Sequence, residues 1–136
     1  ACHRRLFCDD AMVETRFARA WTAWENALAS VHSDGIVGEA PAEYARAFAR
    51  LENHYFLNKG FLEEDGQILR DLAKLKDIPA TIVQGRYDMI CPPVSAWTLA
   101  RNWKRAELRM IPVAGHALSE SGISAELIRV MNGLRA

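Results

Sequence analysis

The sequence lacks any excess of charge and any long apolar run. Seventeen basic and seventeen acidic residues leave the 136-residue chain with a formal net charge of zero. Nothing therefore favours nucleic acid or an anionic membrane surface as a partner. No apolar run approaches the length of a membrane span, and the first ten residues contain no apolar core of a signal peptide. We expect neither a membrane nor a nucleic-acid partner.

Cysteine is also scarce, and its spacing is irregular. Three cysteines, an odd number, do not make a disulfide framework. Cys2, His3 and Cys8 are nominal zinc ligands, but their spacing matches no common zinc pattern and no second ligand pair follows nearby. We expect no metal at these residues and a reducing, cytoplasmic setting.

The first half of the chain shows helical periodicity and many aromatic residues. One helix is predicted from Asp10 to about Val31, with Asp9 or Asp10 as its cap and the run 33–35 as its stop. Its apolar stripe is Val13, Phe17, Ala20, Trp21, Trp24, Leu28 and Val31. A second helix opens at Pro41, which is expected in the first turn. Its stripe is Tyr44, Phe48, Leu51 and Tyr55.

The second half alternates helix and strand. A third helix with Asp65 as a possible cap carries Ile68, Leu72 and Leu75 on one face. The continuous apolar run 80–84 predicts a strand buried on both faces, as in parallel sheets. A helix at 94–103, a strand at 107–111 and a helix at 123–134 complete the pattern. The chain is therefore predicted to be α/β, with a helical subdomain at 1–64 and sheet-domain elements at 65–136.

One acid and one imidazole follow the two predicted strands. The first strand leads to Gly85 and then Asp88, and the second leads to Gly115 and then His116. The carboxyl ends of parallel strands meet at one edge of a sheet, where chemistry is usually found. Asp88 and His116 are therefore expected to be neighbours, as an acid that orients a base.

Two carboxylates lie beside the aromatic stripes of the helical half. Glu25 and Glu52 each fall about 80° from the centre of their stripe at 100° per residue. Such boundary positions are able to point into the edge of a pocket. On pattern alone, two solvated glutamates are the favoured interpretation.

Several short motifs together resemble a known family. They are the Gly85-Arg-Tyr-Asp88 turn with Cys91-Pro92, Ala114-Gly-His116, Trp21-Thr-Ala-Trp24-Glu25, Glu52-Asn-His-Tyr-Phe56 and Ser95-Ala-Trp97. The glycine-containing elements are typical of α/β-hydrolases in general. With the tryptophan and glutamate elements included, residues 12–134 resemble the proline iminopeptidase family.

The resemblance implies a role for each motif residue. Asp88 would be the acid and His116 the base of a serine-hydrolase triad. Glu25 and Glu52, in part of a helical cap, would hold the charged amino terminus of a peptide substrate that begins with proline. Aromatic residues would shape the pocket, namely Trp21, Trp24, Tyr55 and Phe56. The resemblance implies no metal and no cofactor, and Cys91 is interpreted as a bystander in the acid loop.

The family's nucleophile does not occur in these 136 residues. No serine has the Gly-x-Ser-x-Gly flanks of the nucleophile elbow, and the oxyanion-loop motif is missing too. We therefore expect the C-terminal portion of an α/β-hydrolase, inactive by itself. The missing N-terminal half would belong to the same chain or to a separate one. Alternatives are another capped α/β-hydrolase, such as an esterase or epoxide hydrolase, and a non-catalytic remnant that serves as a binding module.

Overall fold

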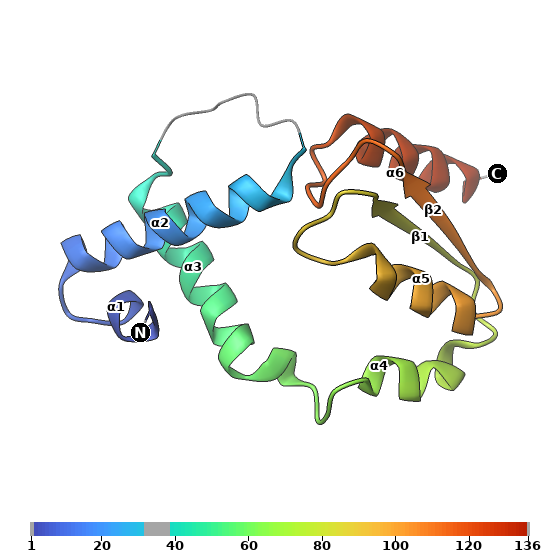
Figure 1. Ribbon diagram of the computed structural model, residues 1–136, viewed down its shortest axis with the longest axis horizontal. Helices are drawn as coiled ribbons and strands as arrows, with labels where there is room; N and C mark the ends of the chain where they lie inside the picture. Colours follow the sequence, from blue (N-terminus) through green and yellow to red (C-terminus); the bar gives the residue numbers. More distant parts are fainter. Residues whose placement is uncertain (1, 32–38, 136) are drawn as a thin grey trace. The chain divides into compact units, whose positions relative to one another are not determined.

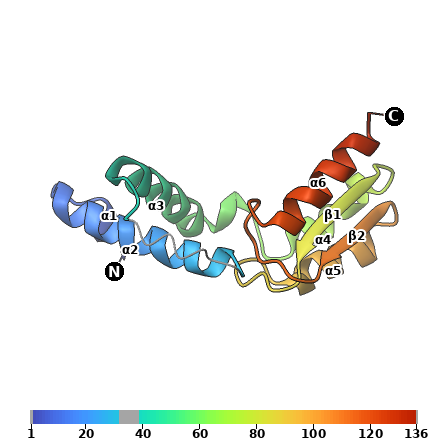
Figure 2. The same cartoon turned by 90° about the horizontal axis from the view of Figure 1, so that it is seen from above.

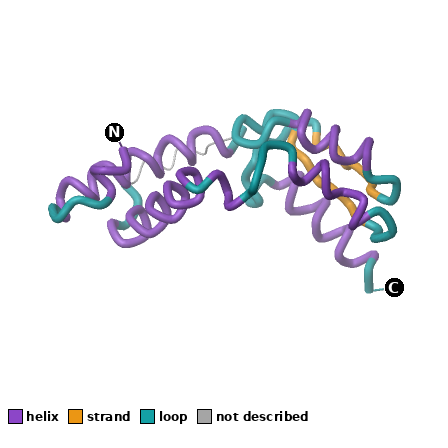
Figure 3. The backbone as a smooth tube through the Cα atoms, turned by 90° about the horizontal axis from the view of Figure 1, so that it is seen from below, coloured by secondary structure: helices purple, strands orange, loops and turns teal. Residues whose placement is uncertain are grey.

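The computed structural model describes residues 2–31 and 39–135, which form two compact units. The first unit contains residues 2–27 and 39–65, and the second contains residues 28–31 and 66–135 (Figure 1). Among the described residues, strands belong to the second unit only (Figure 3). The chain is thus mixed α/β. The assignment of residues 1–64 to a cap and 65–136 to a hydrolase core stays a prediction.

The first unit is helical. Its elements are α1 (Cys2–Leu6), α2 (Ala11–Ala29, whose last residues join the second unit), α3 (Ala42–Leu57) and the short 3₁₀ helix η1 (Lys59–Phe61). The predicted cap of α2 is confirmed, because Asp10 Oδ1 accepts hydrogen bonds from the amides of Met12 and Val13 at 2.9 and 3.2 Å. Helix α1 has no clear signal in the sequence, and the predicted stop at 33–35 lies outside the described residues. Pro41 precedes α3 as its N-cap instead of entering the first turn.

The two large helices pack through small residues, not through their aromatic stripes. The core of the unit consists of Leu6, Ala18, Ala45 and Ala49. Alanine lets two helix backbones approach closely. The stripe predicted for α3 is wrong as a buried face, because Tyr44 is 54% exposed and Tyr55 is 49% exposed. The stripe predicted for α2 is only partly covered, since Trp24 is 65% exposed.

An ion pair between a buried carboxylate and a half-exposed arginine adds to this packing. Glu14 on α2 accepts a hydrogen bond from the guanidinium of Arg50 on α3, 2.6 Å away. Arg50 also donates through Nε to the Leu6 carbonyl at the end of α1. One arginine therefore connects all three helices of the unit.

The second unit is a strand–helix–strand arrangement with helices on both faces (Figure 2). Its elements are α4 (Gln67–Arg70), the 3₁₀ helix η2 (Asp71–Leu75), β1 (Ala80–Gly85), α5 (Pro93–Asn102), β2 (Ala106–Ile111) and α6 (Ser121–Gly133). The predicted parallel pairing is confirmed, with Ala80 opposite Ala106 and Gly85 opposite Ile111. Helices α5 and α6 lie on opposite faces of the two-stranded sheet (Figures 1 and 2).

Two details of this unit differ from the prediction. The third helix is a short α4 followed by η2, and Gly66 rather than Asp65 takes the N-cap position with φ of 80°. Strand β1 is half-buried, not buried on both faces, except for its last residue Gly85. No helix in residues 2–31 and 39–135 has the length and apolar character needed to cross a bilayer.

Candidate active site

The loops that follow β1 and β2 are bonded to each other. The amide of Arg86 donates to the Ile111 carbonyl, and the amide of Tyr87 donates to the Ala114 carbonyl, each over 2.9 Å. The strand register brings Gly85 opposite Ile111, so both loops leave the sheet at the same edge. This is the arrangement expected where parallel strands end together.

Two glycines permit this close approach. A Cβ atom on Gly85 would lie 1.9 Å from the Gly115 carbonyl oxygen, and one on Gly115 would lie 2.7 Å from the Ala29 carbonyl oxygen. Both obstacles are backbone atoms, which cannot rotate out of the way. The need for glycine at these positions is therefore steric.

The structure brings Asp88 and His116 into contact. His116 Nδ1 lies 3.0 Å from Asp88 Oδ2. A carboxylate only accepts hydrogen bonds, so Nδ1 carries the proton and Nε2 is left as the basic nitrogen. The Asp88 side chain is 5% exposed, whereas that of His116 is 41% exposed. A buried acid thus orients an imidazole whose ring remains accessible.

The Asp88 carboxylate is held on both oxygens. Oδ1 accepts from the amides of Cys91 and Ile90, at 2.7 and 3.0 Å, and Oδ2 accepts from Gln84 Nε2 as well as from His116. Burial by itself would raise the pKa of Asp88, but the hydrogen bonds from the Cys91 amide, His116 and the Ile90 amide outweigh it and hold the pKa below its usual value. The acid is accordingly ionised at neutral pH.

The backbone around His116 is fixed by the end of α2. The amides of His116 and Ala117 both donate to the Ala29 carbonyl, over 2.7 and 2.8 Å. Glu120, 9% exposed, accepts a 2.6 Å hydrogen bond from the Val31 amide. These contacts tie residues 28–31 to the loop that carries His116.

Gln84 and Glu120 were not singled out from the sequence. Gln84 is the only polar residue in the apolar run of β1 after Thr81, next to the glycine where the chain turns. That position was a signal that its side chain serves the following loop. Glu120 carried no such signal, because its partner Val31 is far away in sequence.

Cys91 lies beside the acid but is a poor nucleophile. Burial, and to a lesser degree the charge of Asp88, raise the pKa of the Cys91 thiol. A thiol reacts as the thiolate, so a raised pKa lowers its reactivity at neutral pH. This environment agrees with the interpretation of Cys91 as a bystander.

In the first unit, Trp21 lies beside both predicted carboxylates. Its indole N–H donates to Glu52 Oε2 over 2.7 Å. Trp21, Trp24 and Glu25 line a cavity of about 460 Å³, together with Phe56 and apolar residues of α1 and α2. The ring centroids of Trp21 and Phe56 are 6.1 Å apart. The structure thus groups a carboxylate with aromatic side chains in one apolar hollow.

Tyr55 takes a different position from the other predicted aromatic residues. Its ring meets Phe61 edge-on, with centroids 5.3 Å apart, and also lies near His54. It contacts the turn after α3, and it is absent from the lining of the Trp21 cavity. Tyr55 is the one member of the predicted binding set that the first unit does not group with the others.

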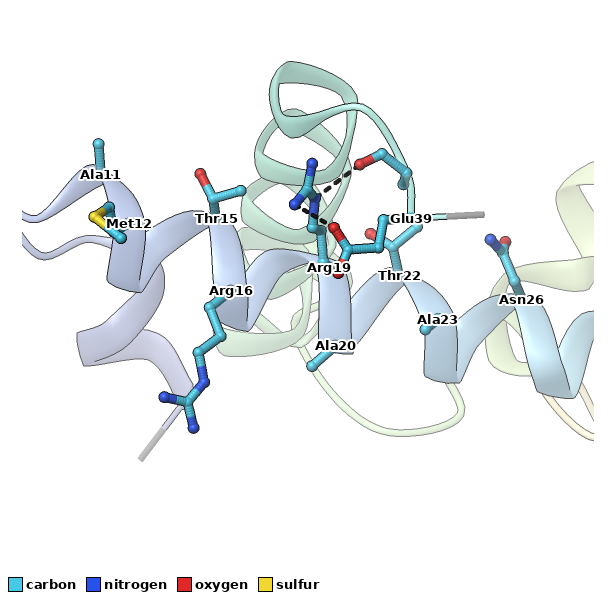
Figure 4. A pocket seen from close by; sticks show the side chains of 11 residues that line it. Ala11, Met12, Thr15, Arg16, Arg19, Ala20, Thr22, Ala23, Asn26 and Glu39 are labelled. Atoms are coloured by element: carbon cyan, nitrogen blue, oxygen red, sulfur yellow. Dashed lines mark hydrogen bonds and ion pairs between the residues drawn. The ribbon is translucent and has the colours of Figure 1, made fainter. Parts of the chain in front are cut away.

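A larger hollow of about 870 Å³ follows another stretch of α2 (Figure 4). Arg19 borders it and is bound on its Nη1 by Glu39, 2.5 Å away, and on its Nε by the Ala40 carbonyl. None of the predicted site residues lines this hollow, so its size alone does not identify the functional site.

Two of the three nominal metal ligands near the amino terminus make other contacts. His3 Nδ1 lies 2.7 Å from Asn53 Oδ1, and the Cys8 thiol donates weakly to the Arg5 carbonyl. Within residues 2–31 and 39–135 there is no group of three His, Cys, Asp or Glu side chains placed to hold a metal ion.

Comparison with known proteins gives one consistent name. No family model matches the chain. A proline iminopeptidase of Xanthomonas citri is 44% identical over 135 residues, which is 98% of this chain and 43% of that protein. One of Arabidopsis thaliana is 44% identical over 138 residues, 100% of this chain and 36% of that protein. One of Neisseria gonorrhoeae is 40% identical over 134 residues, 98% of this chain and 42% of that protein.

These relatives confirm the resemblance inferred from the motifs. The chain spans only 36–43% of the length of the relatives named above. That share fits a C-terminal part of such a protein. Similarity over less than half of each relative does not establish the activity of the whole protein.

Proposed function

We propose that this chain is the C-terminal part of a proline iminopeptidase with an α/β-hydrolase fold, a serine peptidase that releases proline from the amino terminus of peptides. The observation that carries the proposal is the 3.0 Å contact between Asp88 and His116 at the ends of β1 and β2. Similarity to proteins named proline iminopeptidase supports the substrate class. Cytoplasmic localisation stays a prediction that rests on the cysteine count.

His116 is the proposed general base. With Nδ1 bound to Asp88, its Nε2 takes the proton of a serine hydroxyl as the serine attacks the carbonyl of the terminal proline. Asp88 fixes the tautomer and stabilises the imidazolium that forms. His116 then returns the proton to the leaving amine, and water releases proline from the acyl-enzyme in a second half-reaction.

Glu25 and Glu52 are the proposed acceptors for the substrate's amino terminus. An N-terminal proline is a secondary ammonium with two N–H donors, and a charged group enclosed by apolar walls needs anionic partners. The aromatic lining of the Trp21 cavity, and Tyr55 in the last turn of α3, supply apolar surface for the ring and the residues that follow it. This supports recognition of a short apolar ammonium.

The nucleophile and oxyanion hole are proposed to come from the remainder of the hydrolase, in the same polypeptide or in a separate one. The many large apolar side chains that are exposed in the second unit support this, because extensive apolar surface usually marks an interface. They include Trp97 on α5, Tyr87 after β1 and Met131 on α6. We expect the 136 residues alone to be inactive.

The test is hydrolysis of proline naphthylamide by the complete protein. Release of naphthylamine from free proline naphthylamide, and its loss with the N-acetylated substrate, is the expected result. An acetyl group removes the charge that Glu25 and Glu52 would bind. Turnover of simple esters or epoxides without prolyl hydrolysis would instead indicate another capped α/β-hydrolase, and no turnover of any of them would indicate a binding module.

A further inference from the structure

Gln84 is bonded to three points of the acid loop. Its side-chain nitrogen Nε2 lies 3.0 Å from Asp88 Oδ2, 3.2 Å from the Gly85 carbonyl oxygen and 3.2 Å from the Cys91 carbonyl oxygen. These acceptors stand at the beginning, the middle and the end of the loop. One half-buried side chain therefore closes the loop on itself.

The three acceptors also fix the orientation of the Gln84 amide. An amide has one end that donates and one that accepts, and neighbouring groups decide which end is which. Two carbonyl oxygens and a carboxylate oxygen surround this atom. Only the NH₂ end satisfies them, so Gln84 is a donor toward Asp88.

Gln84 and His116 share one oxygen of the acid. Asp88 Oδ2 accepts from Gln84 Nε2 and from His116 Nδ1, each over 3.0 Å, while Oδ1 is occupied by two backbone amides. A second donor on Oδ2 draws charge away from the bond to the imidazole. It also prevents the carboxylate from rotating about its axis.

We propose that Gln84 is a positioning residue that holds Asp88 Oδ2 toward His116 and moderates the basicity of the imidazole. The inference rests on the proposed function, since it assigns His116 the part of the base. Gln84 is proposed to act only through Asp88, the side chain that it contacts.

Other titratable groups around the pair have separate partners. Cys91 stands in the acid loop with its thiol protonated, because burial and Asp88 raise its pKa. Glu120, beyond His116, accepts from the Val31 amide. Both are present in every variant below, so a shift between variants reports the change at residue 84.

The test uses the complete protein and two variants, Gln84→Met and Gln84→Glu. Methionine keeps the length of the side chain and removes the donor. We expect the plateau of kcat/KM to fall about tenfold, as for other partners that orient a reacting group. The acid limb of the kcat/KM profile, which reports the base of the free enzyme, should move up by about half a pH unit.

Glutamate has the shape of glutamine but replaces the donor with an acceptor and adds charge. It should move the acid limb further in the same direction. Met110→Leu is the matched control, because Met110 is the register partner of Gln84 in β2 and lies outside the catalytic groups. The control should leave the limb in place, and melting curves establish that each variant is folded.

The outcomes separate this inference from the proposed function. If the wild-type protein hydrolyses p-nitrophenyl acetate but not proline naphthylamide, the proposed substrate class is wrong. The acid limb of the kcat/KM profile is then measured with the ester as substrate. If neither substrate reacts, the low-field NMR signal of the His116 Nδ1 proton tests the role of Gln84 instead. This signal should shift in Gln84→Met. An acid limb or proton signal that stays at the wild-type position in both folded variants overturns the role of Gln84, even where the plateau falls.

Discussion

The indole N–H of Trp21 and the carboxylate of Glu52 are joined by a 2.7 Å hydrogen bond between α2 and α3. Trp21 also lines the cavity that contains Glu25. One aromatic residue therefore forms part of the apolar wall and at the same time orients a carboxylate. This double contact explains why tryptophan suits the position better than a purely apolar ring.

Replacing Trp21 by phenylalanine removes the donor and keeps an aromatic wall. Hydrogen bonds to charged groups contribute roughly 1.5–3 kcal/mol, so we expect KM for proline naphthylamide to rise by about tenfold or more with little change in kcat. Trp24→Phe is the control, since Trp24 lines the same cavity and is largely exposed. Equal KM values for the two variants would show that the bond to Glu52 does not matter for binding.

Gly85→Ala is expected to destabilise the fold by about 3 kcal/mol or more, because the added Cβ overlaps backbone atoms. The Gly115 carbonyl oxygen would lie 1.9 Å from that Cβ. Urea unfolding of the complete protein measures the loss.

Gly133→Ala supplies the matched comparison. Gly133 is in α6, and a Cβ there meets nothing within 4 Å. Alanine in a helix is favoured over glycine, so this variant should be neutral or up to about 1 kcal/mol more stable. Similar destabilisation by both substitutions would contradict the steric role of Gly85.

The hydrogen bonds to Asp88 predict a dependence of stability on pH. Its pKa in the folded protein is below the usual 3.8, so the folded state binds fewer protons than the unfolded state between the two values. Ionised Asp88 therefore contributes stability above pH 3.8, and this contribution is lost as the pH falls through the folded pKa.

Asp88→Asn isolates this contribution. The difference in free energy of unfolding between wild type and variant should be large at neutral pH and should shrink as the solution is acidified below the usual aspartate range. The exposed Asp9, replaced by asparagine, serves as a control that should track wild type. If the difference in free energy of unfolding does not change with pH, the ionised Asp88 carboxylate does not contribute to stability in this way.

Glu120→Ala tests the connection between residues 28–31 and the loop that carries His116. Loss of the hydrogen bond from the Val31 amide should lower the free energy of unfolding by about 1 kcal/mol. Hydrogen exchange at the His116 and Ala117 amides should become faster, since both donate to Ala29 in the same segment. Glu120→Gln keeps an acceptor oxygen and should exchange as wild type does; equally fast exchange in both variants would argue against this link.

The strand–helix–strand unit and the contact between Asp88 and His116 could be predicted because short stretches of local sequence determine them. Each strand is a short apolar run that ends at a glycine, and parallel neighbours end at one edge. Nothing beyond sequence order was needed to expect Asp88 near His116.

The faces of α2 and α3 could not be predicted in the same way. Apolar periodicity favours the largest side chains as the core, whereas the buried positions are Ala18, Ala45 and Ala49. Small residues give a weak periodic signal, and their burial depends on how closely two backbones approach. Gln84 and Glu120 could not be predicted for a related reason, because the tertiary structure determines which groups they hydrogen-bond.

The Ala29 carbonyl, which receives the amides of both His116 and Ala117, has a consequence for how α2 can change. Adding or deleting a residue between Leu28 and Ala29, which both belong to the second unit, would rotate that carbonyl by about 100° relative to Leu28 and disturb both hydrogen bonds. Point substitutions on the helix surface leave it in place. Length variation among homologous chains should therefore avoid the junction of Leu28 and Ala29, and an engineered insertion there should speed hydrogen exchange at the His116 and Ala117 amides even where every side chain of the site is retained.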